Sequence, residues 1–270
     1  MQRRETAEHL DTAGALAPPE LARSLREVWQ VNRYLGGMGV LQRHLGRLLG
    51  DTGRDNRQPG DPGRGNHRPG GRVSGAAQSG NRRRATLLDV GTGAADVPLA
   101  LLGWARRRQL ELTIVAVDRE EAMVTLARHR TAGTGAIWVE RADGRALPYA
   151  AASFDVALCN LALHHLDPDG AVRLLRELAR VSRRGWLVAD LERRLPAYLA
   201  AQALSVALWR SPITRHDGPL SVQRAYTRAE AERLVQAAGV RAQVCRHFPF
   251  RLALVGVPAC LDPVGAPTDG

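Results

Sequence analysis

The sequence predicts a three-layer α/β fold in which helices cover both faces of a mostly parallel β-sheet. From Thr86 onward, short apolar runs alternate with helical patterns. Those runs lack polar alternation, which is typical of parallel strands that are buried on both faces. The chain then has two β-like runs, "VRAQVCRH" and "RLALVGV", with no helical pattern between them. They predict an antiparallel hairpin at the end of the sheet.

The elements of this domain, residues 85–258, follow in order along the chain. The expected strands are 86–90, 112–117, 137–141, 154–160 and 185–190. The expected helices are 94–108, 120–130, 169–181 and one that begins at the capping box "TRAE" and ends near Gly239. Residues 191–226 break the rhythm, so we expect them to form an insertion.

Two further segments flank this domain. Residues 19–49 have an amphipathic helical pattern with a break at "GG", so we expect residues 1–50 to form a helical N-terminal lid. Residues 51–84 are rich in Gly, Arg, Asn, Asp, Ser and Pro and have almost no large apolar side chain, which predicts a disordered linker. Residues 259–270 are expected to be a flexible tail.

Composition excludes several classes of protein. The net charge is +11, and every one of the 38 basic residues is Arg, but residues 51–84 hold eight of the arginines against three aspartates. The rest of the chain is therefore closer to neutral. Only 4% of the residues are aromatic, which is too few for a surface that stacks bases, so we do not expect a nucleic-acid partner. The cysteines form no CxxC spacing, and no apolar run is long enough to span a bilayer or act as a signal peptide. We therefore expect a cytoplasmic protein without metal, and the sequence leaves a homodimer open.

The functional residues are expected at the carboxyl ends of the parallel strands, where open α/β sheets bind ligands. They are Asp89, Gly91, Gly93 and Asp96 after the first strand, Asp118 with Arg119 after the second, Asp143 with Gly144 after the third, and Asn160 after the fourth. A single aspartate in such a place often only caps a helix. Four carboxylates together would repel a pyrophosphate, and they suit a ligand with hydroxyls, amines and a positive centre. S-adenosylmethionine has this chemistry.

Three stretches carry a resemblance to a known family. "LLDVGTGAADV", "VAVDRE" and "ADGRALPYAAASFDVALCNLALHHL" resemble the motifs of class I S-adenosylmethionine-dependent methyltransferases. The "TGAAD" and "LPYAAASFD" spellings are similar to the type 11 branch, with its ubiquinone/menaquinone and related small-molecule C- and O-methyltransferases. The resemblance implies a Rossmann-like methyltransferase fold with seven strands, the last of them antiparallel.

The same resemblance assigns roles to the residues at the strand ends. It implies that Gly91 and Gly93 line the methionine part of the donor and that Asp118 takes the ribose. It also implies that Asp143 with Gly144 borders the adenine, while Asn160 faces the donor. Ala95 stands where many members of the family have a third glycine.

The acceptor side is less defined by the sequence. A base is needed only if the acceptor is protic, and the candidates are His165, His216 and Asp190, although a histidine in a loop is more often structural. His216 lies in "TRHDGPLSVQRAY", which resembles a segment of bacterial methyltransferases associated with polyketide and quinone-like products. The run "AYLAAQALSVALW" is apolar nearly all round as a helix, so it is buried or covers an apolar ligand. We expect a lid from residues 19–49 and 191–222, with Tyr34 and Trp209 against the acceptor.

The sequence therefore predicts methyl transfer to a small hydrophobic or aromatic acceptor, phenolic, quinone-like or polyketide, at oxygen or carbon. Two alternatives stay open: an RNA or DNA methyltransferase, and a non-catalytic protein that binds S-adenosylmethionine. The "NLALHH" that follows the fourth strand lacks the Pro-Pro-aromatic run of many amino-methylating nucleic-acid enzymes. An NAD-linked oxidoreductase is disfavoured by Asp96.

Overall fold

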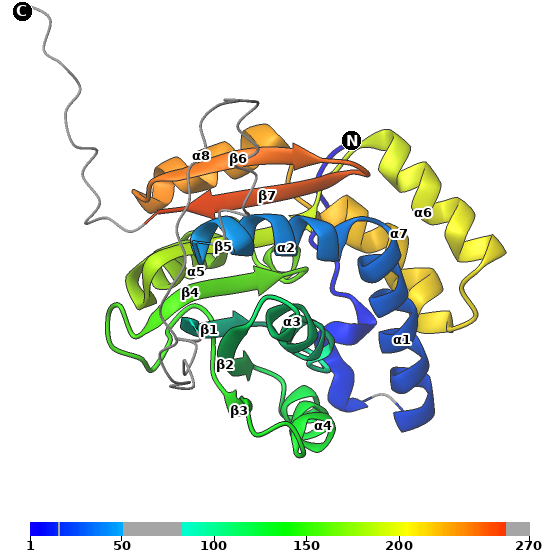
Figure 1. Ribbon diagram of the computed structural model, residues 1–270. Coiled ribbons are helices and arrows are strands. Elements are labelled where there is room, and N and C mark those ends of the chain that lie inside the picture. Colours follow the sequence, from blue (N-terminus) through cyan, green and yellow to red (C-terminus); the bar gives the residue numbers. More distant parts are fainter. Residues whose placement is uncertain (16, 51–82, 258–270) are drawn as a thin grey trace, which may run out of the picture.

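A single seven-stranded sheet forms the centre of the molecule (Figure 1). The computed structural model describes residues 1–15, 17–50 and 83–257. The strand order is β3-β2-β1-β4-β5-β7-β6, and β7 runs antiparallel to both of its neighbours while the other pairs are parallel. The strands are β1 (Arg83–Val90), β2 (Leu110–Asp118), β3 (Ile137–Arg141), β4 (Phe154–Asn160), β5 (Ser182–Leu191), β6 (Ala242–His247) and β7 (Arg251–Gly256). The predicted fold class and terminal hairpin are confirmed.

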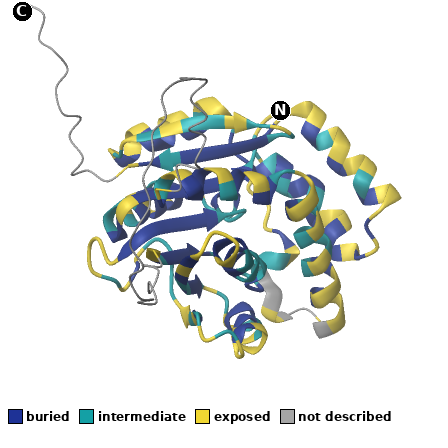
Figure 2. Ribbon diagram, viewed as in Figure 1, coloured by how far each residue is buried: buried dark blue, intermediate teal, exposed yellow. Residues whose placement is uncertain are grey.

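Helices cover both faces of the sheet, so the central strands β4, β5 and β7 are mostly buried, whereas the edge strands β3 and β6 are more exposed (Figure 2). α2 and α3 pack on one face, and α5 and α8 pack on the other. The helices are α1 (Pro18–Tyr34), α2 (Gly37–Leu48), α3 (Asp96–Arg106), α4 (Glu121–Thr131), α5 (Pro168–Val181), α6 (Leu195–Ala207), α7 (Pro212–Arg224) and α8 (Arg228–Ala238), with short 3-10 turns η1 (His9–Ala15) and η2 (Leu163–His165). The predicted capping box of α8 is present, with Thr227 and Glu230 bonding to each other's backbone amides.

The direction of the chain across the sheet reverses at β1. Leu87 of β1 lies opposite Ile114 of β2 on one side and Val156 of β4 on the other. The chain continues from β1 outward to β2 and β3, and then returns to add β4 on the opposite side. Such a reversal leaves a crevice at the carboxyl ends of the two central strands, which is where open α/β sheets bind ligands.

The expected N-terminal lid divides into two parts with different roles. Leu41 and Leu45 of α2 are 0% and 1% exposed and belong to the same apolar core as Leu187 of β5 and Ala253 of β7. α2 is therefore part of the domain and not a lid, which corrects the prediction. Only the segment up to the end of α1 lies over the ligand-binding edge, beside α6 and α7 (Figure 1).

The insertion between β5 and α8 is helical. α6 covers most of the predicted apolar run, and α7 contains the stretch "PITRHDGPLSVQR", including Pro219. This part of the insertion, in which we expect His216 to lie in a loop, is therefore a helix. The predicted linker extends two residues too far, because Arg83 and Arg84 already belong to β1; residues 51–82 and the predicted tail lie outside the described residues. None of the described helices is long and apolar enough to cross a membrane.

The core role of α2 can be tested by stability alone. Leu41→Ala is expected to lower the free energy of unfolding by about 2–5 kcal/mol, because the substitution leaves a cavity against the sheet. Urea unfolding followed by circular dichroism, without any ligand, measures this. Leu199→Ala on α6 is the control, since Leu199 is 57% exposed, and it should change stability by less than about 0.5 kcal/mol. Equal stability of Leu41→Ala and the unsubstituted protein would contradict the assignment.

Candidate active site

The turn after β1 brings the backbone to the carboxyl edge of the sheet. Gly91 and Gly93 have φ angles of 73° and 55°, in the left-handed region that glycine adopts without strain. The amides of Gly91 and Thr92 both donate to the carbonyl oxygen of Val117, at 2.9 and 3.0 Å, which ties the turn to β2. A Cβ on Gly91 would lie 2.7 Å from the Cβ of Ala162, so the residue also needs to be small.

Ala95 completes this turn in a strained conformation. It is fully buried and has φ 60° and ψ 25°, just before α3 begins. A left-handed conformation costs a residue with a Cβ about 1–2 kcal/mol. Many members of the family that the sequence resembles have glycine here. The alanine of this chain therefore replaces a glycine at a position where the backbone is strained.

A cavity of about 880 Å³ opens at this edge of the sheet. Its size lies within the range of small-molecule sites. Ten of the predicted site residues line it: Gly91, Gly93, Asp96, Asp118, Arg119, Asp143, Gly144, Asn160, His165 and Trp209. Three others, Asp89, Tyr34 and His216, do not line it.

Asp118 stands at the end of β2 with both carboxylate oxygens held by backbone amides. Oδ2 accepts from Gly93 at 2.8 Å and Oδ1 accepts from Glu120 at 3.0 Å. Burial raises the pKa of Asp118, and these amide hydrogen bonds oppose the rise. A carboxylate has about four acceptor positions, so each oxygen keeps one for a ligand hydroxyl.

Arginines neutralise two of the other predicted carboxylates. Arg145 donates to both oxygens of Asp143, with its Nη2 2.6 Å from Oδ2, and this lowers the pKa of Asp143. Arg130 of α4 lies with its Nη2 2.6 Å from Oδ1 of Asp96. Arg130 therefore offsets the attraction that the sequence predicts between Asp96 and a positively charged sulfur. This corrects the prediction for Asp96. Nothing in the sequence predicts that Arg130 or Arg145 forms these pairs, because the chain has many arginines.

Asp89 lies behind the glycine turn and not on the cavity wall. It is 2% exposed, and its Oδ2 has no hydrogen-bond partner among the described residues. Burial raises the pKa of Asp89 to about 7. Asp89 therefore does not border the cavity, and the donor-binding role that we predict for it would have to act through water or the backbone of the turn.

The far half of the cavity is apolar. Trp29 of α1, Leu204 of α6 and Phe250 before β7 line it together with the predicted Trp209, which is 8% exposed. Tyr34 is 72% exposed and points away from this wall, so its predicted lid role is wrong. On α1 the helical register turns Trp29 inward and Tyr34 outward.

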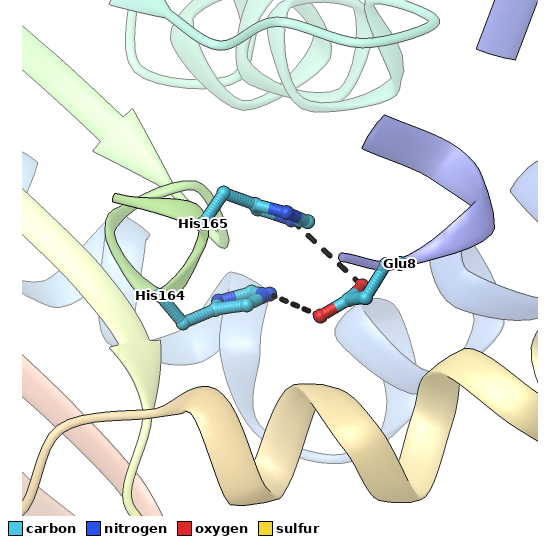
Figure 3. Close-up of side chains that lie close together, drawn as sticks. All are labelled: Glu8, His164 and His165. Atoms are coloured by element: carbon cyan, nitrogen blue, oxygen red, sulfur yellow. Dashed lines mark ion pairs between the residues drawn. The ribbon is translucent and has the colours of Figure 1, made fainter. Parts of the chain in front are cut away.

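A buried polar cluster lies between the two halves (Figure 3). Nδ1 of His164 is 2.7 Å from Oδ1 of Asp190, and Nδ1 of His165 is 2.5 Å from Oδ1 of Asp11. Glu8, 3% exposed, reaches toward both rings from the N-terminal segment. Burial raises the pKa of Glu8 to about 7. Burial also acts on Asp11, but the hydrogen bond and charge of His165 outweigh it and hold the pKa of Asp11 below its usual range.

Arg224 of α7 fixes the N-terminal segment over this cluster. Its Nη1 donates to Oδ2 of Asp11 at 2.6 Å and to the carbonyl oxygen of Thr6 at 3.1 Å, while its Nη2 donates to the carbonyl oxygen of His165 at 3.0 Å. One buried guanidinium thus joins residues that are far apart in the sequence. Sequence reasoning missed Glu8, Asp11 and Arg224, because nothing local marks residues 1–15 as part of a site.

His216 lies outside the cavity on the exposed side of α7. Its Nδ1 is 2.8 Å from Oδ1 of Asp217, and its ring meets His9 edge-on with 4.3 Å between centroids. Asp217 also accepts from the amides of His9 and Leu10. The predicted catalytic role of His216 is therefore wrong; the residue helps to hold η1 against α7.

The residues present fit S-adenosylmethionine. Oδ1 of Asn160 and Oγ1 of Thr92 are buried on the cavity wall without a partner among the described residues. The first suits an ammonium donor, and Asp118 offers acceptors for hydroxyls. Gly144 also keeps the wall low, since a Cβ there would lie 2.6 Å from Cγ1 of Val90. Together with the strand order, these features define an α/β protein that binds a nucleoside donor at its switch point.

Comparison with known proteins identifies the class of enzyme. Residues 88–189 match the family described as "Methyltransferase domain". This stretch contains the glycine turn, Asp118, Asp143 and Asn160. Residues 88–189 are therefore a methyltransferase domain of the S-adenosylmethionine-dependent class, which makes S-adenosylmethionine the methyl donor of this domain. A search of curated proteins by sequence found no match to the chain.

Several solved structures are similar to part of the chain. A SAM-dependent methyltransferase from Aquifex aeolicus is 19% identical, with 65% of this chain and 84% of that one aligned at a TM-score of 0.48. One from Methanosarcina mazei is 14% identical, over 65% and 93% of the two chains, with a TM-score of 0.48. The CMeT domain of the citrinin polyketide synthase is 12% identical, over 66% and 47%, with a TM-score of 0.50. At this identity the likeness to the CMeT domain is one of fold alone.

The role of Asp118 is tested by ligand affinity. Asp118→Ala is expected to weaken S-adenosylmethionine at least about tenfold, because hydrogen bonds to a charged group contribute roughly 1.5–3 kcal/mol. Isothermal calorimetry with S-adenosylmethionine, and in parallel with NAD, measures this. Glu111→Ala, at the opposite end of β2 and paired with Arg84 on the surface, is the matched control. Unchanged affinity in Asp118→Ala, or tight binding of NAD, would contradict the site.

The burial of Asp89 predicts a pH dependence of stability. Its folded pKa of about 7 lies above the ordinary value of 3.8, so the unfolded chain releases the proton first and stability falls as pH rises from about 4 to 7. Asp89→Asn removes this dependence. The stability of the variant relative to the unsubstituted protein should rise by on the order of 2 kcal/mol between pH 5 and pH 8. Urea titrations at both pH values check it, and parallel curves would refute the assignment.

Proposed function

We propose that the protein methylates a small apolar or aromatic acceptor, at oxygen or carbon, inside the cavity at the carboxyl edge of the sheet. The observation that carries this proposal is the continuity of the cavity. The same space that borders the glycine turn and Asp118 extends to Trp29, Trp209 and Phe250. A donor at the turn would therefore face an acceptor in the apolar half.

The walls of the apolar half favour a small ligand over a nucleic acid. α1 and α6 line it with mostly aliphatic and aromatic side chains, and α7 adds Val222 beside more polar residues. A nucleic acid would need an open basic surface with stacking aromatics, whereas the aromatic side chains here line a cavity. This supports a compact acceptor with a large apolar surface.

Alignment is the main task of these walls. The sulfonium donor supplies an activated methyl group, so positioning of the acceptor carries much of the rate. Gly91, Gly93 and Asn160 would hold the methionine part, and Asp118 the ribose. These contacts fix the direction from which the acceptor must approach.

The polar cluster gives the acceptor's ionisable group a place to lose its proton. His165 is its most exposed member and lines the cavity. With its Nδ1–H donated to Asp11, the neutral ring keeps a lone pair on Nε2. We infer that a phenolic or enolic oxygen lies beside this ring, so that His165→Ala lowers turnover without weakening the donor.

The proposed function is tested by methyl transfer from radiolabelled S-adenosylmethionine to a panel of phenols, hydroxyquinones, polyketide-like enols and RNA. Transfer to one or more of the small acceptors, about 100-fold reduced in His165→Ala, is the expected result. Transfer to RNA alone would overturn the proposal in favour of a nucleic-acid enzyme. Binding of the donor without transfer to any acceptor would favour a non-catalytic binding protein.

The acceptor chamber is tested by a pair of tryptophan variants. Trp29→Ala and Trp209→Ala should each raise the KM of the best acceptor about tenfold, because each removes an aromatic surface worth roughly 1.5–3 kcal/mol when buried, while leaving the affinity for S-adenosylmethionine unchanged. Tyr34→Ala, on the exposed face of α1, is the matched control and should behave like the unsubstituted protein. An unchanged KM in both tryptophan variants, with native circular dichroism spectra, would place the acceptor elsewhere.

A further inference from the structure

Three side chains from two distant segments converge inside the cavity wall (Figure 3). Nε2 of His164 lies 3.7 Å from Oε1 of Glu8, and Nε2 of His165 lies 4.0 Å from Oε2 of the same carboxylate. These separations exceed hydrogen-bonding distance. The three groups therefore point at one another across a gap without bonding directly, and Oε1 of Glu8 is buried without a hydrogen-bond partner among the described residues.

Both rings are oriented so that the same nitrogen faces the gap. Asp190 holds Nδ1 of His164 and Asp11 holds Nδ1 of His165. Each carboxylate accepts the Nδ1–H and leaves the Nε2 lone pair toward Glu8. Histidines that bind metals almost always donate their other ring N–H in this way, often to a carboxylate, which fixes the tautomer and raises ligand basicity.

The charge around the gap is negative. Four buried or half-buried acids lie around the gap: Glu8, Asp11, Asp190 and Asp217. The cations of the same region are the half-buried Arg3, which donates to the carbonyl oxygen of His164, and the buried Arg224 and Arg251. With neutral histidines these acids exceed the arginines by one, so the charge around the gap favours a cation.

We propose that Glu8, His164 and His165 bind one divalent transition-metal ion, with Zn²⁺ as the best match to the ligand types. The ligand atoms all lie within 4.8 Å of one another, so a metal at about 2.0–2.2 Å from each fits after small side-chain adjustments. Two imidazoles and one carboxylate are a common set for zinc and for ferrous iron. His165 lines the cavity, and the coordination positions left open face the acceptor chamber.

The ion deepens the proposed function at the same cluster. A hydroxyl of the acceptor bound at an open position would lose its proton to water more readily, because the metal lowers the pKa of a coordinated oxygen. His165 then acts as a ligand and not as the base. This last step rests on the proposed function, whereas metal binding does not.

Metal binding is measured on the full chain, stripped with a chelator and without donor or acceptor. Calorimetry with Zn²⁺, and absorption spectra with Co²⁺ as a probe, should give one equivalent per chain. His164→Ala, His165→Ala and Glu8→Gln should each abolish this binding, and Asp190→Asn and Asp11→Asn should weaken it about 10–100-fold. Calorimetry with S-adenosylmethionine serves as the folding check, because the donor half of the cavity is intact in each variant.

The chain offers a matched control in the second group of possible ligands, His9, His216 and Asp217. His216→Ala should keep the one equivalent and the Co²⁺ spectrum. The inference is overturned if neither ion binds, or if binding survives in His164→Ala and His165→Ala but is lost in His216→Ala. Metal binding without transfer to small acceptors would sink the proposed function alone. Full methyl transfer by the chelated protein, abolished in His165→Ala, would sink the metal site alone and leave His165 as the base.

Discussion

The reversal of the chain at β1 is the constraint from which the site follows. β1 carries one neighbour on each side, and the chain reaches them by separate routes. The carboxyl ends of β1 and β4 are therefore left without a covering crossover, and the turn at Gly91 and the loop at Asn160 meet there. The predicted donor residues lie at or just after the carboxyl ends of β1, β2, β3 and β4, so sheet topology brings together residues that lie up to about 70 positions apart.

Closure of that crevice depends on a second, weaker framework. Arg224 holds the N-terminal segment and η2 together through backbone carbonyls and Asp11. A guanidinium is suited to this, because its planar fork donates several hydrogen bonds at once and stays charged when buried. Without residues 1–15 the cavity would open to water above His164 and His165. This side of the cavity is thus assembled by contacts between the N-terminal segment, η2 and α7, and not by pairing of strands in the sheet.

The elements, and the residues that lie at the strand ends, can be predicted from the sequence because their signals are local. Apolar runs, the capping box at Thr227 and the glycine turn each lie within a few residues, and their order determines the topology. The partners of the charges were not readable. Arg130 and Arg145 are two of many arginines, and nothing near Glu8 indicates that it meets residues more than 150 positions away. The burial of α2 and the outward turn of Tyr34 also depend on which face the sheet covers, which periodicity alone does not give.

The acids in the two halves of the cavity differ in whether their oxygens already have hydrogen-bond partners. In the donor half, Asp96 and Asp143 have arginine partners and Asp118 has backbone amides, so these groups are satisfied before any ligand arrives. In the acceptor half, Glu8 faces two histidines across distances too long for a hydrogen bond. Oε2 of Glu8 accepts from Ser221 at 2.9 Å, but Oε1 is buried without a hydrogen-bond partner among the described residues and lies 3.8 Å from Nε of Arg224. A buried oxygen without a hydrogen bond costs stability. A group kept at that cost beside a ligand cavity is a candidate for function. Whether a proton or a metal ion lies between Glu8 and the two histidines would decide how an acceptor in this cavity is activated.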